Sequence, residues 1–253
     1  MRPRAGAHLW PLAARENKDS TVNFIKMALA ALIGSGLLAG PVAAAEYRSF
    51  AAADGTRIDY AVVLPENYQP GESYPVMLAF PPGPQTKAMV EAGLRYWEGE
   101  GARRGYVVVS PVAPRQGLYF QGGAPYIADI FAEISGRYNV AGGKVHVSGI
   151  SNGGISAFHA AAAFPELVKT ITVLPGFPQA GNQVLERFKD VPLIMFAGAR
   201  DRGWISRMNA TAEAMRRLGG DVHFEIVPGE GHVIQSLAGR NASRLFDLIE
   251  AKR

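Results

Sequence analysis

The segment at residues 149–154, Gly-Ile-Ser-Asn-Gly-Gly, constrains the fold of this chain more than any other part of its sequence. The residues before it, 144–148, form a β-rich run that predicts a strand, and residues 155–164 predict a helix. The connection is too sharp for side chains on its flanks, which explains the glycines around Ser151. The pattern G-x-S-x-G in this context predicts a nucleophile elbow with Ser151 at the top of a sheet. A glycine-rich turn without chemistry is the alternative.

The partners that Ser151 would need are present further along the chain. A serine hydroxyl is a poor nucleophile unless a base lies within hydrogen-bonding distance and a carboxylate orients that base. Asp201 follows the apolar run 191–198, which predicts a buried strand, and His232 follows the predicted strand 221–228. Because the carboxyl ends of parallel strands meet at one edge of a sheet, we expect Ser151, Asp201 and His232 to form a catalytic triad.

Each partner also has an ordinary structural explanation. Asp201 could cap the helix that follows it, since aspartate is a favoured N-cap residue, and His232 could be a loop histidine without a function. Three other histidines fall within predicted strands or helices and are interpreted as structural: His146, His159 and His223. Of these, only His223 lies close enough in sequence to compete with His232.

These motifs resemble the α/β-hydrolase superfamily, and in particular its small secreted esterase branch, which includes polyhydroxybutyrate-depolymerase-like and feruloyl-esterase-like proteins. The resemblance covers roughly residues 58–248, and it rests on residues 149–154, 198–201 and 228–232. It implies an α/β-hydrolase fold and the hydrolysis of carboxylic esters through an acyl-enzyme. Dienelactone-hydrolase-like proteins share this fold but use a cysteine nucleophile, which the absence of cysteine excludes here.

The expected oxyanion hole departs from the family pattern at one point. The backbone N–H of Asn152, directly after the serine, is expected to be one donor. The second is expected from the loop after the predicted strand 74–80, where the family often has a His-Gly pair, but this loop reads Pro-Pro-Gly-Pro-Gln. Since prolines have no N–H, Phe80, Gly83 and Gln85 remain, and Gly83 is the preferred donor.

The rest of the chain alternates predicted strands and helices, which is typical of a mostly parallel sheet with helices on both faces. Eight strands are expected, beginning with a hairpin of residues 46–53 and 56–64. Long helices are expected at 85–104 and 233–251. Only residues 175–190 join the sixth and seventh strands, so we expect no large cap domain and an open site that suits polymer ends or bulky esters.

Three aromatic residues are candidates for substrate contacts. Tyr119 and Phe120 lie in the loop at 115–124, and Trp204 comes shortly after Asp201. They could line an acyl or aromatic pocket, and ordinary loop packing is an equal alternative.

The N-terminal part predicts an exported protein. Lys26 precedes the apolar run 27–40, and small residues precede Glu46, so residues 1–45 are expected to be a leader with a signal peptide that is cleaved after Ala45. A membrane anchor is the alternative, because the apolar stretch approaches the length that spans a bilayer. If the signal peptide is cleaved, residues 46–253 would be one secreted or periplasmic hydrolase domain without stable membrane association.

Charge and composition narrow the partners. The net charge of +4 comes largely from the leader, since residues 46–253 hold 21 basic and 20 acidic side chains without a basic stripe. Nucleic-acid binding is therefore not expected. No metal, phosphate or dinucleotide motif is present, so no cofactor is expected. The expected partner is a small-molecule or polymer-end ester, and the sequence does not indicate the oligomeric state. Two alternatives remain, a serine peptidase of the prolyl-oligopeptidase type and a non-catalytic binding protein on the same scaffold.

Overall fold

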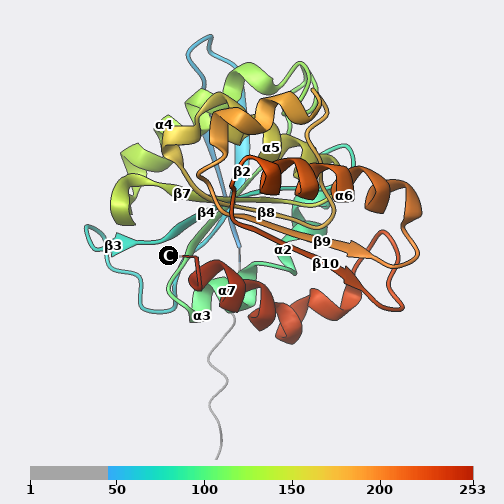
Figure 1. Cartoon of the computed structure of the whole chain (residues 1–253). Coiled ribbons are helices and arrows are strands. Elements are labelled where there is room, and N and C mark those ends of the chain that lie inside the picture. The colour runs from blue at the N-terminus through green and yellow to red at the C-terminus, as the bar shows by residue number, and fades with distance from the viewer. Residues whose placement is uncertain (1–44, 253) are drawn as a thin grey trace, which may run out of the picture. The chain divides into compact units, whose positions relative to one another are not determined.

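Apolar, β-branched runs form the central strands of one sheet. The computed structural model describes residues 45–252, so the predicted signal peptide lies outside the described residues. The eight strands lie in the order β1 (Glu46–Ala51), β2 (Arg57–Val63), β5 (Val107–Pro111), β4 (Val76–Phe80), β7 (Val145–Gly149), β8 (Val168–Val173), β9 (Leu193–Gly198) and β10 (Val222–Val227) (Figure 1). Strand β2 is antiparallel to both neighbours, and all other pairs are parallel. The mostly parallel, eight-stranded sheet predicted from the sequence is confirmed.

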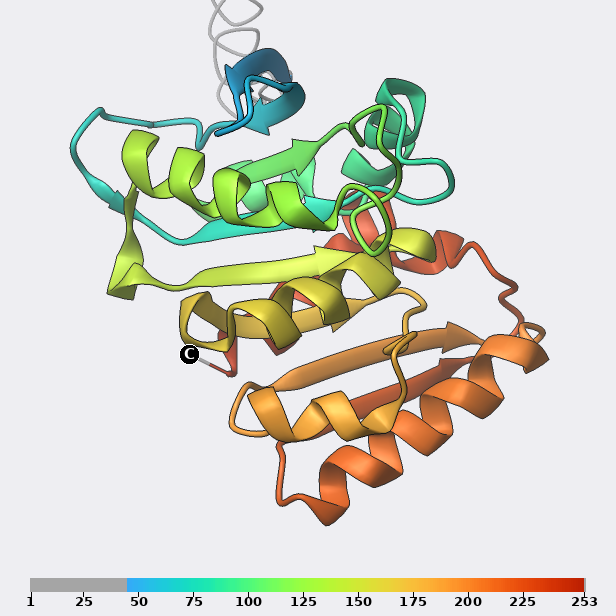
Figure 2. The same ribbon diagram turned by 90° about the horizontal axis from the view of Figure 1, so that it is seen from above.

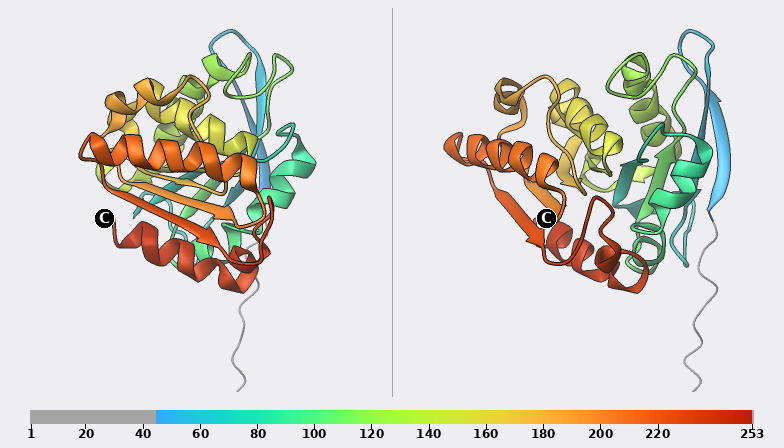
Figure 3. Two further views of the ribbon diagram at one scale, coloured as in Figure 1. Left: turned by 45° about the vertical axis from the view of Figure 1, so that its right-hand side comes forward. Right: turned by 90° about the vertical axis from the view of Figure 1, so that its right-hand side faces the viewer.

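Helices cover both faces of this sheet, as the alternating pattern predicts. One face packs against α4 (Ile127–Arg137), α5 (Asn152–Ala163) and α6 (Arg202–Arg217), and the other against α2 (Lys87–Leu94), α3 (Glu98–Arg103) and α7 (Ser243–Glu250) (Figures 1 and 2). Figure 3 shows the twisted sheet between these two layers. Strands β4, β5, β7 and β9 are buried along their whole length, because helices exclude water from both of their faces.

Two expected helices are interrupted. The helix expected at 85–104 is divided into α2 and α3, and the turn between them lets the adjacent side chains of Tyr96 and Trp97 both enter the core. The helix expected at 233–251 is regular only in α7, because two short 3₁₀ turns, η5 (Gln235–Leu237) and η6 (Gly239–Ala242), precede it. Gly239 has a φ of +60°, which stops a right-handed helix.

Smaller elements connect the main ones. The strand expected at 74–80 is divided at Pro75, because proline has no N–H to donate to a neighbouring strand. Residues after it form β4, and the short strand β3 (Ser73–Tyr74) before it pairs with β6 (Asn139–Val140). The remaining 3₁₀ turns are η1 (Ala124–Tyr126), η2 (Ala141–Gly143), η3 (Pro165–Leu167) and η4 (Asn182–Phe188). Among the residues that the structure describes, only η4 lies between β8 and β9, where a cap would be inserted. Within residues 45–252, no helix combines the length and the apolar character that crossing a bilayer requires.

Candidate active site

Ser151 lies in the turn between β7 and α5, at the carboxyl edge of the sheet. Its φ of 57° and ψ of −117° are unusual for a residue with a side chain, and its N–H donates to the carbonyl oxygen of Pro175 at 2.9 Å. The turn is also sterically closed. A Cβ on Gly149 would lie 2.0 Å from the carbonyl oxygen of Gly153, and a Cβ on Gly153 would lie 2.1 Å from that of Phe80. Only glycines at these two positions permit the strained backbone that exposes Ser151.

A chain of two contacts joins the serine to a histidine and an aspartate. His232 Nε2 lies 2.8 Å from Ser151 Oγ, and His232 Nδ1 lies 2.6 Å from Asp201 Oδ2. The three residues follow β7, β9 and β10, whose carboxyl ends meet at one edge of the sheet. The Asp201 side chain is 13% exposed, whereas that of His232 is 42% exposed. The carboxylate is thus shielded from water, which strengthens its hydrogen bond, and the imidazole stays accessible from outside.

The structure also argues against the alternatives that Asp201 is only a helix cap and that another histidine is the base. Asp201 occupies the N-cap position of α6, but its carboxylate makes no capping hydrogen bond and is directed at His232 instead. His223 lies within β10, where its Nε2 is 3.7 Å from Glu225. His146 is buried in β7 and contacts the hydroxyl of Thr170. Of these histidines, His232 is the one that contacts Ser151.

Backbone hydrogen bonds hold the aspartate and histidine loops together. The N–H of Ala199 donates to the carbonyl oxygen of Val227, and the N–H of Arg200 donates to that of Glu230, both at 2.9 Å. These bonds run between the segment that leads to Asp201 and the segment that leads to the histidine. The separation of the two side chains is therefore set by main-chain geometry.

The three predicted aromatic contacts have different environments. The Trp204 ring lies 5.1 Å from the His232 ring and 4.9 Å from that of Phe177, so it borders the site. Phe120 lines a cavity beside α5. Tyr119 is completely buried, and its hydroxyl donates to the carbonyl oxygen of Val112, so it supports the loop from inside and does not line the cavity.

The proline-rich loop after β4 lies against the start of α5. The Gln85 N–H donates to the Pro82 carbonyl oxygen, which closes a tight turn, and Gly83 has a φ of +55° within it. The Asn152 side-chain amide donates to the carbonyl oxygen of Gly83 at 3.0 Å. Among the described residues, neither the Gly83 N–H nor the Asn152 N–H makes a turn or loop hydrogen bond to another backbone group. The Asn152 side chain thus joins the Gly83 loop directly to the residue after Ser151.

The side chain of Gln85 connects this loop to its surroundings, a role that sequence reasoning missed because it considered only the Gln85 backbone N–H. Gln85 is completely buried and has a φ of 54°. Its Oε1 accepts from the Tyr119 N–H at 3.0 Å, and its Nε2 donates to Ser156 Oγ at 2.9 Å. The Ser156 hydroxyl in turn donates to the Asn152 carbonyl oxygen at 3.0 Å. One amide thus ties the proline-rich loop to two further segments.

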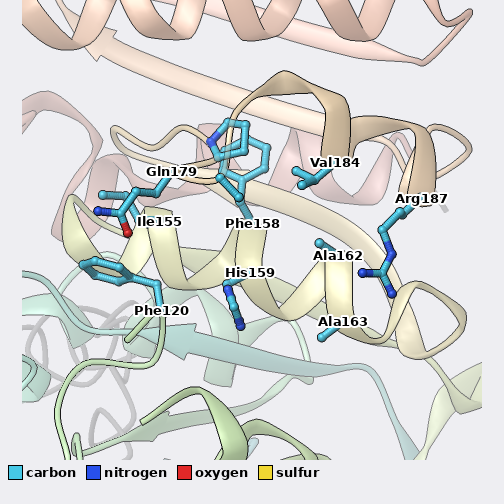
Figure 4. Close-up of a pocket in the computed structure, with 11 residues that line it drawn as sticks. Phe120, Ile155, Phe158, His159, Ala162, Ala163, Gln179, Val184 and Arg187 are labelled. Carbon is cyan, nitrogen blue, oxygen red and sulfur yellow. The ribbon is translucent and has the colours of Figure 1, made fainter. Parts of the chain in front are cut away.

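A cavity of about 510 Å³ lies along α5 (Figure 4). Its lining includes His159, which sequence reasoning set aside as structural, and Arg187, which it did not consider. Partial burial lowers the pKa of His159 below its usual value. The sequence could have indicated that His159 shares a surface with Ile155, because residues four positions apart lie on one face of a helix. Within residues 45–252, no group of three or more histidine, aspartate or glutamate side chains could hold a metal ion.

Comparisons with known proteins bear on this architecture. No protein-family model matches the sequence, and no curated protein matches it. A thermostable esterase superposes with a TM-score of 0.67 at 18% identity, and the match covers 83% of this chain and 63% of the esterase. An S-formylglutathione hydrolase from Agrobacterium tumefaciens superposes with a TM-score of 0.64 at 16% identity, covering 81% of this chain and 93% of the hydrolase.

A third similar structure is larger. A candidate dipeptidyl aminopeptidase IV from Bacteroides ovatus superposes with a TM-score of 0.64 at 19% identity, and the match covers 83% of this chain and 35% of that protein. This chain therefore spans less than two thirds of the thermostable esterase and about a third of the aminopeptidase. At these identities the similarity identifies the fold, and the described residues adopt the α/β-hydrolase fold that the sequence predicts.

Proposed function

We propose that this protein is an exported serine hydrolase that cleaves carboxylic esters with Ser151, Asp201 and His232. The observation that carries the proposal is the unbroken line of contacts from the Asp201 carboxylate through the His232 imidazole to the Ser151 hydroxyl, at 2.6 and 2.8 Å. A nucleophile, its base and the group that orients the base are the three parts that acyl transfer by serine requires.

The proposed reaction has two stages. Ser151 Oγ attacks the ester carbonyl while His232 Nε2 takes the serine proton and then gives it to the leaving alcohol. Asp201 accepts the hydrogen bond from Nδ1, which holds the imidazole in the reactive tautomer and stabilises the imidazolium. Water, activated by the same histidine, then attacks the acyl-enzyme and releases the acid. No cofactor takes part in these steps.

The developing oxyanion is assigned to two backbone amides. The Asn152 and Gly83 N–H groups are the donors, and each such donor contributes about 2.7–4 kcal/mol to the stabilisation of the transition state. The hydrogen bond from the Asn152 side chain to the Gly83 carbonyl oxygen supports this assignment, because it joins the two donor segments. The loop lacks a His-Gly pair, and Gly83 would take its place.

The exposure of the site suits bulky or polymeric esters. The His232 imidazole, which is 42% exposed, is reached without crossing an inserted cap, since only η4 lies between β8 and β9 among the described residues. An ester with a bulky or polymeric group could enter from solvent, as in the small secreted esterase branch that the motif at 149–154 resembles. A peptidase is the second candidate, because the candidate dipeptidyl aminopeptidase IV that superposes on this chain shares its fold.

Export is the remaining part of the proposal. It is supported by Lys26, the apolar run at 27–40 and the small residues before Glu46. Intact-mass analysis of the protein recovered from the medium or periplasm of expressing bacteria should give an N-terminus at Glu46. Recovery of the uncleaved chain from the membrane fraction would favour the anchor.

Labelling with a fluorophosphonate probe tests the chemistry. The purified protein should be labelled, the Ser151→Ala variant should not, and the His232→Ala variant should react much more slowly. A panel of p-nitrophenyl esters and aminoacyl-p-nitroanilides then separates the candidates, since an esterase turns over the first set and a peptidase the second. A folded protein that is not labelled and cleaves neither set would be a binding protein on this scaffold.

A further inference from the structure

We propose that the cavity beside α5 binds one arm of the ester, a linear apolar chain that ends in a carboxylate held by Arg187. This inference rests on the proposed function, because it assumes that the reacting carbonyl sits at Ser151. It names the class of substrate that the site would take.

The cavity lies along the helix that follows the nucleophile, and its lining on that helix begins at Ile155, four positions after Ser151. Helix α5 begins at Asn152, directly after the serine, and Ile155, Phe158 and Ala162 all line the cavity. These residues lie three, four and seven positions apart, which places them on one face of the helix. Figure 4 shows Ile155 and Phe120 at one end of the cavity and Ala162 at the other. A bound chain would therefore start one helical turn from Ser151 and follow α5.

The walls suit a hydrocarbon chain. Along α5 they are formed by Ile155, Phe158 and Ala162, and Pro178 and Val184 add to the apolar lining. Each methylene that such walls shield from water raises affinity about fourfold. His159 also lines the cavity, and its partial burial lowers the pKa of the imidazole, which favours the neutral form.

Arg187 supplies a charge at the far end. Figure 4 shows its side chain beside Ala162 and Ala163, away from Phe120. Among the described residues that line the cavity, it is the only one with a permanent charge. It forms no ion pair within residues 45–252, and the adjacent Glu186 is paired with Lys189 at 2.7 Å. An unpaired guanidinium at the end of an apolar cavity is suited to a carboxylate, which it can bind in bidentate geometry.

The helix gives the length of the arm. Ala162 lies eleven positions after Ser151, which corresponds to about 16 Å at the α-helical rise. An extended chain advances about 3.3–3.6 Å for every three bonds, so about 14 bonds span this distance, and fewer suffice when Arg187 reaches toward the chain. The expected arm has about ten to fourteen atoms between the ester and its terminal carboxylate.

A pair of substrates that differ only in the terminal charge tests the proposal. One is the p-nitrophenyl ester of dodecanedioic acid with its second carboxylate free, and the other carries a neutral carboxamide in place of that carboxylate. Wild-type enzyme should have a kcat/KM about three- to tenfold higher for the carboxylate. In Arg187→Gln this ratio should fall to about one. Arg216→Gln, a change at an exposed position in the last turn of α6, should keep the wild-type ratio.

The position of the carboxylate identifies the arm that occupies the cavity. The acetate ester of 12-hydroxydodecanoate places the carboxylate on the alcohol side, and its carboxamide analogue is the matched neutral substrate. A preference for the carboxylate in this pair alone assigns the cavity to the alcohol, and a preference in the dodecanedioate pair alone assigns it to the acyl group. Equal kcat/KM values within both pairs would overturn the proposal.

Binding without turnover separates this inference from the proposed function. Wild-type enzyme that hydrolyses no p-nitrophenyl acetate and takes no fluorophosphonate label would disprove the serine chemistry alone. Isothermal titration calorimetry of Ser151→Ala with dodecanedioic acid monoamide and with the diamide then tests the cavity directly. The monoamide, which keeps one carboxylate, should bind about three- to tenfold more tightly, and adding Arg187→Gln should remove the difference. Equal affinities of the two ligands for Ser151→Ala would refute the role of Arg187.

Discussion

Gly198 and Gly231 touch through their backbones, and a Cβ on Gly198 would lie only 2.0 Å from the Gly231 carbonyl oxygen. Gly198 ends β9, three residues before Asp201, and Gly231 directly precedes His232. The carboxylate and the imidazole therefore meet because the two loops that carry them pass at a distance that admits no side chain.

This contact predicts that Gly198→Ala disrupts the site. The added Cβ would push the aspartate loop away from the histidine loop, and a misplacement of about 1 Å in an active site can reduce turnover about a hundredfold. We expect kcat for p-nitrophenyl butyrate to fall by about that factor. Gly203→Ala is the matched control, because no atom lies within 4 Å of a Cβ there. Equal turnover by the two variants would contradict the steric argument.

Removal of the nucleophile should nearly abolish turnover. Ser151→Ala is expected to lower kcat by about a million-fold, and the double variant with His232→Ala should lose little more, because the members of a triad act as a unit. Ester hydrolysis followed at saturating substrate measures both. His223→Ala should keep near-normal turnover, since that side chain lies beside Glu225 and not beside the serine. Loss of activity in His223→Ala alone would reverse the assignment of the base.

Stability should depend on Arg104, which joins α3 to α7. Its guanidinium contacts Glu100 at 2.9 Å, Asp247 at 2.6 Å and Glu250 at 2.9 Å, and its side chain is only 14% exposed. Arg104→Met leaves these carboxylates without that cation, and we expect the free energy of unfolding to fall by about 2–4 kcal/mol at pH 7.

The pH dependence of this loss has a defined sign. Hydrogen bonds from Arg103 and Arg104 hold the pKa of Glu100 below its usual value. The stabilisation is therefore complete above the unfolded pKa of about 4.5 and disappears as the pH falls through the lower, folded-state value. Urea unfolding at pH 7 and pH 3.5 should show a smaller difference between wild type and Arg104→Met at pH 3.5. Arg217→Met, which changes an exposed arginine 4.0 Å from Glu213, should have little effect at either pH.

The contact between Ser151, Asp201 and His232 could be predicted because it depends on order and topology. Each residue follows a strand that reads clearly as apolar or alternating, and parallel strands bring those ends together. Strand number and direction could be predicted for the same reason. The broken helices could not, because the turn before Trp97 and the positive φ of Gly239 are selected by packing that local propensity does not contain.

The loop environments were equally beyond prediction. Tyr119 and Phe120 are neighbours in sequence, yet one is fully buried and the other lines the cavity. The Tyr119 N–H donates to the side chain of Gln85, a residue 34 positions away. A sequence pattern with a range of a few residues does not record such a contact.

Gln85 offers the sharpest test of the proline-rich loop. Gln85→Met keeps the side chain's size but removes its bonds to the Tyr119 N–H and to Ser156, and each polar group left buried and unpaired costs about 1–3 kcal/mol. If Gln85 positions the Gly83 donor, kcat should fall about tenfold or more while KM stays near the wild-type value, because the oxyanion forms only in the transition state. Thr170→Val is the control, since it removes a buried bond to His146 far from the loop and should lower stability without this fall in kcat. A purely structural role for Gln85 predicts that both variants lose stability and that neither loses turnover.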